Sequence, residues 1–131
     1  MPHRNILALT AAVFIVLPAL AHADGADKKP KATFISIPGL AATVMRPQGG
    51  HGVMTVEAGL DAPDPALNAN VLLQLPRLQD AYTQILQAYG GALRPGTLPD
   101  PDYVARQLQT ATDRVLGRPG ARLLLGGIMV N

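Results

Sequence analysis

The chain has 131 residues, a formal net charge of +2, 48% hydrophobic residues, only 4% aromatic residues and no cysteine. This length fits a single domain, and the lack of cysteine excludes a small scaffold held together by disulfide bonds. The basic residues are scattered along the chain except at Lys28, Lys29 and Lys31, so the charge does not indicate a surface that binds nucleic acid.

The N-terminus has the pattern of a secretory signal peptide. Residues 6–21 form an apolar run of sixteen, preceded by His3 and Arg4 and followed by a small-residue cleavage motif that ends at Ala23. The alternative is a short uncleaved membrane anchor over residues 1–23, although a span needs about 20 apolar residues. We predict cleavage after Ala23, and with either outcome the rest of the chain is expected outside the cytoplasm. Cleavage removes one basic and no acidic residue, which lowers the net charge from +2 to +1.

Residues 24–32 are polar and show no hydrophobic periodicity, which predicts a linker. We interpret its lysines as a solvated tether and not as a binding patch. The folded domain is expected over residues 33–131. Because the chain has no cysteine, the core of that domain has to be held by packing.

Two apolar segments at the start of the domain predict a β-hairpin. The first contains Phe34, Ile35 and Ile37 and is interrupted by Pro38, which is expected at a break or an edge position because proline has no N–H to donate. The second alternates with a period of two, which is typical of a half-buried strand. Its apolar face is made of Met54, Val56, Ala58 and Leu60. The glycine-rich segment RPQGGHG between them predicts the turn.

A long amphipathic helix is predicted next. Asp64 is its expected N-cap, Pro65 its first residue, and Gly90 and Gly91 its stop signal. Its apolar stripe is expected at Leu72, Leu75, Leu78, Tyr82, Ile85 and Tyr89, widened by Leu73 and Leu86. Pro76 lies inside this helix, where its ring clashes with the preceding turn at a cost of about 3 kcal/mol, so the helix is expected to bend just before it.

A second helix and a last strand complete the predicted domain. Asp100 and Pro101 repeat the start signal, and Gly117 ends the helix. Its apolar face is expected at Val104, Leu108, Ala111, Val115 and Leu116. The apolar residues 121–131 predict a buried strand. The order strand-strand-helix-helix-strand predicts an α+β fold in which two helices, the first bent at Pro76, cover one face of a small antiparallel or mixed sheet.

Few residues are available for catalysis or for metal binding. After residue 23 the chain has one serine, Ser36, and one histidine, His51, and the predicted strand and turn that hold them favour structural roles over a nucleophile with its base. One imidazole is too few for a zinc site. Four carboxylates flank the two helix starts, and helix capping and the helix dipole explain them better than acid-base catalysis: Asp61, Asp64, Asp100 and Asp102. We therefore predict no catalytic residue, no cofactor and no metal.

Three motifs and the order of elements resemble a known family. The motifs are FISIPGL in the first strand, VEAGLDAPDP after the second, and LPRLQDAYTQIL, which holds Pro76, Arg77, Leu78 and Asp80. A helix end VLG and a strand close to the last residue follow. With these features residues 34–131 resemble the periplasmic domain of the FliL family, the flagellar basal-body-associated proteins.

The resemblance implies a function without catalysis. Members of the family resemble stomatin-like (SPFH) domains, sit at the inner membrane facing the periplasm, form rings and contact the stator units of the flagellar motor, so that they support rotation and swimming. For this chain it implies self-association, stator or basal-body partners, and a location in the periplasm or at the inner membrane if the N-terminal segment is not cleaved. Pro76 would open a second helical segment, with Arg77 and Asp80 as structural or interaction positions at the bend.

Two other functions remain open. The first is a soluble periplasmic binding or assembly module with the same fold and no flagellar role, because one fold commonly carries several functions. The second is a hydrolase, which would have to use Ser36 or His51.

Overall fold

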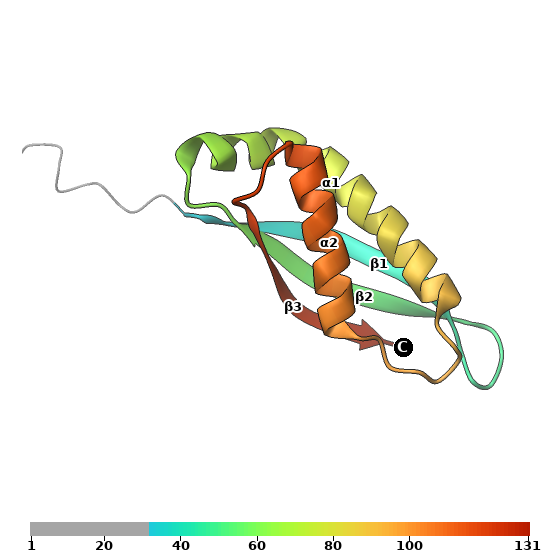
Figure 1. Ribbon diagram of the computed structural model, residues 1–131. Coiled ribbons are helices and arrows are strands. Elements are labelled where there is room, and N and C mark those ends of the chain that lie inside the picture. The colour runs from blue at the N-terminus through green and yellow to red at the C-terminus, as the bar shows by residue number, and fades with distance from the viewer. Residues whose placement is uncertain (1–31) are drawn as a thin grey trace, which may run out of the picture. The chain divides into compact units, whose positions relative to one another are not determined.

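Three antiparallel strands and two helices make up the domain, which the computed structural model describes over residues 32–131. The predicted signal peptide, the cleavage position Ala23 and almost all of the predicted linker lie outside these residues. In chain order the elements are β1 (Phe34–Met45), β2 (His51–Asp61), α1 (Pro65–Ala92), α2 (Pro101–Leu116) and β3 (Arg122–Val130). The sheet order is β1-β2-β3 (Figure 1), which confirms the predicted α+β fold. Neither of these helices is long and apolar enough to cross a membrane.

The predicted hairpin of β1 and β2 is confirmed. Met45 lies opposite His51 beside the turn, and Phe34 lies opposite Asp61 at the far end. The register shifts next to Pro38, between Ile37 and Leu40, because a residue without an N–H cannot continue the ladder. The glycine after the proline has a φ of 73°, a backbone conformation that glycine adopts without strain.

Both helices pack on the same face of the sheet, α1 over β1 and α2 over β3 (Figure 1). The alternation predicted for β2 is confirmed, because the residues of the apolar face are each at most 8% exposed under the helices: Met54, Val56, Ala58 and Leu60. Burying one such aliphatic side chain contributes about 1.5–3 kcal/mol to folding. The core is therefore a single layer between one face of the sheet and the helix pair.

The helix α1 bends at Pro76, as predicted, and Figure 1 shows its first and second halves running in different directions. The helix remains continuous through the proline. Its buried positions are Leu67, Val71, Leu78, Tyr82, Leu86 and Gly90. The predicted stripe is confirmed at the buried Leu78, Tyr82 and Leu86 and at the half-buried Leu75, Ile85 and Tyr89. It is wrong at Leu72 and Leu73, which are 53% and 80% exposed. Leu67 and Val71 meet the core in the first turns, and with the half-buried Leu75 they continue at helical spacing to Leu78.

The predicted stop at Gly90 and Gly91 is wrong, because α1 continues to Ala92. A Cβ placed on Gly90 would lie 2.7 Å from the backbone oxygen of Thr43 in β1, whereas one on Gly91 would meet nothing within 4 Å. The first glycine therefore allows the helix to approach the strand closely. It is a packing residue and does not end the helix.

The start and end predicted for α2 are confirmed. Asp100 caps the helix, and Gly117 follows it with a φ of 76° in the left-handed region. The strand β3 is also present, but the prediction that it is buried is wrong: only Leu123 among its residues is buried. The reason is its position at the edge of the sheet, where a single helix covers one of its faces.

Candidate interaction surface of the sheet

The face of the sheet opposite the helices carries large apolar side chains that no described element covers. Val53 and Thr55 alternate with the buried Met54 and Val56, so their side chains point to this open face. Its most exposed apolar side chains, 42–56% accessible, are Phe34, Met45, Val53 and Met129. Large apolar side chains left uncovered along one face of a sheet are typical of a surface that binds another protein.

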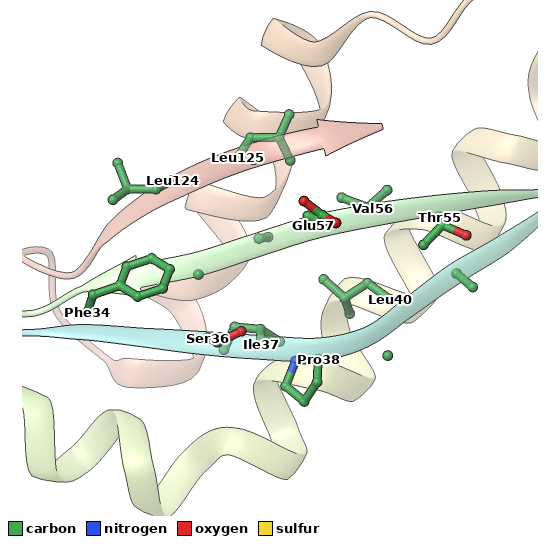
Figure 2. A pocket seen from close by; sticks show the side chains of 15 residues that line it. Phe34, Ser36, Ile37, Pro38, Leu40, Thr55, Val56, Glu57, Leu124 and Leu125 are labelled. Carbon is green, nitrogen blue, oxygen red and sulfur yellow. The ribbon is translucent and has the colours of Figure 1, made fainter. Parts of the chain in front are cut away.

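The open face is hollowed near the bulge of β1. The hollow has a volume of about 640 Å³ and is lined from all three strands (Figure 2). The ring of Phe34 lies across β2 at Gly59, where a Cβ would collide with it. Glu57 is the one charged residue among the lining side chains. The hollow can therefore accept an apolar side chain, with a carboxylate available to a basic neighbour of that side chain.

The free edge of β1 is occupied by side chains of α1. The Gln79 amide Nε2 donates to the carbonyl oxygen of Pro38 at 2.8 Å, and the Thr43 N–H donates to Oε1 of Gln87 at 3.3 Å. A proline and a bulge further prevent another strand from pairing at an edge. The β1 edge is thus blocked both by its own sequence and by the helix beside it.

The free edge of β3 is open over its second half. Gln109 of α2 provides a hydrogen-bond partner only at the start of β3, where its Oε1 accepts from the Leu123 N–H at 2.8 Å. At the other end Asn131 and Val53 exchange both backbone bonds, at 3.0 and 3.3 Å. Because bonded pairs alternate along an antiparallel ladder, Ile128 then directs its N–H and C=O away from β2. This half of β3 has no proline and no charged residue, so it can pair with an added strand.

The residues that the resemblance singled out lie on α1, away from this surface. Arg77 Nη1 donates to Oε1 of Gln74 at 3.3 Å, and Asp80 Oδ2 accepts from Nε2 of Gln84 at 3.0 Å. Arg77 and Asp80 are not paired with each other. With Pro76 they line a shallow depression of about 350 Å³ beside α2.

Ser36 and His51 lie far apart. Ser36 is opposite Gly59, whereas His51 begins β2 and lies opposite Met45. The eight residues from His51 to Gly59 correspond to roughly 26 Å at about 3.3 Å per residue of strand. Within residues 32–131 no three His, Cys, Asp or Glu side chains lie close enough together to hold a metal ion.

Asp64 and Asp100 cap the two helices, as predicted, whereas Asp61 ends β2 and caps neither helix: its Oδ1 is buried without a hydrogen-bond partner among the described residues. Asp64 Oδ1 accepts from the Ala66 N–H at 2.9 Å, and Asp100 Oδ1 accepts from the Asp102 N–H at 3.0 Å. Asp64 is also ion-paired with Arg118 in the segment before β3. The hydrogen bond from Arg118, followed by that from Ala66, lowers the pKa of Asp64. These groups hold the ends of the helices.

Sequence reasoning missed the difference between the two edges of the sheet. The absence of charge and proline from residues 123–130 was a usable signal for an open edge. The glutamines that block the β1 edge lie more than forty positions from it in the sequence, so no local pattern indicates their role. In comparisons with family models, with curated proteins and with solved structures, none matched the chain. The likeness to the FliL family therefore stays a prediction from the sequence.

Proposed function

We propose that this chain is a non-enzymatic, FliL-like protein that binds other proteins through its sheet, at the flagellar basal body and stator on the periplasmic side of the inner membrane. There it supports flagellar rotation and swimming. The observation that supports this proposal best is the uncovered apolar face of the sheet, which continues to an open strand edge. The order of the elements agrees with the sequence resemblance.

Self-association would use the open half of β3. Two copies paired edge to edge through Ile128 would form one six-stranded antiparallel sheet around a twofold axis. Because the β1 edge is blocked by Gln79 and Gln87, this pairing ends at two copies. A ring would need the open face as its second contact.

The edge contact is tested with Ile128→Pro. The substitution removes an N–H that points away from β2, so the ladder within the domain is kept while pairing with an added strand is lost. Ile128→Ala is the matched control, since it removes the side chain and retains the N–H. Sedimentation of both variants should show that only the proline variant loses self-association. Equal self-association would contradict edge pairing.

The flagellar role is tested by deletion and complementation in a flagellated host. Loss of the gene should reduce swimming. Val53→Asp or Met129→Asp, on the open face, should fail to restore it, whereas Leu73→Asp on the exposed side of α1 should restore it. Unimpaired swimming after deletion would contradict the proposal, as would complementation by all three variants.

The second candidate function is a soluble periplasmic binding module without a flagellar role. It is favoured by a pocket with two arginines at one end of the domain, described in the next subsection. Mass spectrometry of the mature protein separates the two candidates in part, because cleavage after Ala23 favours the soluble module over an anchored motor component.

A further inference from the structure

A second pocket lies where the β1–β2 turn, the α1–α2 loop and the end of β3 come together. The volume of this distal pocket is about 610 Å³, and its lining includes Val44, Arg46, Leu93, Arg94, Leu98 and Val130. The turn and the loop are in close contact, since a Cβ on Gly96 would lie 3.2 Å from Cγ of Pro47. Figure 1 shows these segments at the end of the sheet where β1 finishes and β2 begins.

The lining of the distal pocket is largely apolar. Val44 is buried against the core, and Leu93 is half-buried beside it. Leu98, in the α1–α2 loop, is 85% exposed, and Val130 at the end of β3 is 46% exposed. An apolar guest could therefore remove from water both loop and strand side chains that the domain itself leaves exposed.

The charged side chains that line the distal pocket are both arginines. Arg46 comes from the turn and Arg94 from the loop, no aspartate or glutamate side chain lines the pocket, and Asn131, the last residue of the sequence, lines it as well. Within residues 32–131 the one ion pair joins Asp64 to Arg118, so neither pocket arginine is bound to a carboxylate there. A guanidinium presents several N–H donors in a planar fork that matches a carboxylate.

We propose that the distal pocket binds a small amphiphile with an apolar body and one carboxylate. The apolar body would lie against Val44, Leu93 and Leu98, and the carboxylate would accept hydrogen bonds from Arg46 and Arg94. The volume lies within the roughly 300–1,000 Å³ that is usual for small-molecule sites. A concave site of this size also fits a single small molecule better than the flat surface of a bilayer.

Titration of the purified full-length protein with decanoate, below the concentration at which decanoate aggregates, tests the proposal. Amide chemical shifts should change at residues 44–49 and 93–98. The double variant Arg46→Gln/Arg94→Gln should bind at least about tenfold more weakly, equivalent to about 1.4 kcal/mol. Arg106→Gln, an exposed arginine on α2, removes one charge elsewhere and should leave binding unchanged. Decan-1-ol, which lacks the carboxylate, should bind weakly and equally to all variants.

Other outcomes would overturn the proposal. Equal decanoate affinity in the double variant and in Arg106→Gln would show that the arginines do not hold the carboxylate. Chemical-shift changes confined to the open face of the sheet would place the site elsewhere. A change in sedimentation coefficient in the double variant, without an effect on decanoate binding, would assign the pocket to a second copy of the chain. Thermal melting of every variant separates these results from loss of the fold, since both pocket arginines are exposed.

Discussion

The hydroxyl group of Tyr82 is hydrogen-bonded to the hydroxyl group of Thr112 in the buried contact between α1 and α2. Thr112 donates its own proton to the carbonyl oxygen of Leu108 at 2.7 Å, so Tyr82 is the donor of the pair. Burial raises the pKa of Tyr82 to about 12. The contact thus stabilises the helix pair only while the phenol is protonated.

This pair predicts a loss of stability at alkaline pH. The pKa of Tyr82 is about 12 in the folded protein against 10.0 for an unperturbed tyrosine. The folded state therefore keeps a proton that the unfolded state releases, so the contribution is complete below pH 10 and disappears as the pH rises toward 12. The free energy of unfolding lost over this pH range is about 2–3 kcal/mol in total.

Tyr82→Phe should remove this pH dependence. At neutral pH it should cost about 0.5–1.5 kcal/mol for the lost hydrogen bond, since Thr112 keeps its bond to Leu108. Urea unfolding at pH 8 and at pH 11 measures both effects. An equally steep alkaline decline in the variant would show that another group is responsible.

The two glycines near the end of α1 should respond to alanine in opposite directions. Gly90→Ala brings a methyl group to 2.7 Å from the Thr43 carbonyl oxygen, so the helix must move away from β1. We expect a loss of about 1–3 kcal/mol. Gly91→Ala meets no neighbour and should gain about 0.5–1 kcal/mol from better helix propensity. Thermal unfolding of both variants is the measurement, and similar melting temperatures would contradict the close approach.

The leucines of α1 should separate into core and surface positions. Leu78 is fully buried, so Leu78→Ala should destabilise the domain by about 2–5 kcal/mol. Leu73 is 80% exposed, and Leu73→Ala should change the free energy of unfolding by no more than about 0.5 kcal/mol. Chemical denaturation of both variants would reveal a wrong helix face if Leu73→Ala proved the more damaging change.

The N-cap of α2 should depend on the side-chain oxygen and not on the charge. Asp100→Ala removes the acceptor for the N–H groups of Asp102 and Tyr103 and should cost about 1 kcal/mol. Asp100→Asn keeps an acceptor oxygen and should retain most of the stability. If both variants lost the same amount, the carboxylate charge would be responsible instead.

The features that were predicted correctly depend on neighbours in the sequence. Asp64 and Asp100 precede a proline at the first turn, and a short side chain there can reach only the first N–H groups of the helix. Pro38 interrupts β1 because it has no N–H to donate. The alternation of β2 follows from the two faces of a strand. Each of these features depends on residues only a few positions apart in the sequence.

The features that were missed depend on residues distant in sequence. Leu72 and Leu73 look like core residues, yet the side of α1 that packs on the sheet carries Leu67, Val71 and Leu78 and leaves them exposed. Gly90 looks like a stop until β1 is placed against it. The apolar pattern of β3 does not tell a buried strand from an edge strand, because that depends on how many neighbours it has in the sheet.

The order of the elements, the caps of the helices and the position of the bend follow from the amino-acid sequence, because backbone and side-chain chemistry within a turn or two sets them. The packing of the elements was needed to establish that α1 blocks one edge of the sheet while the edge of β3 stays open, and that Arg46 and Arg94 line the same pocket. These relationships join residues more than forty positions apart. They arise when both helices bury their apolar faces on one side of the sheet, which leaves the other side and one edge without a partner in this domain.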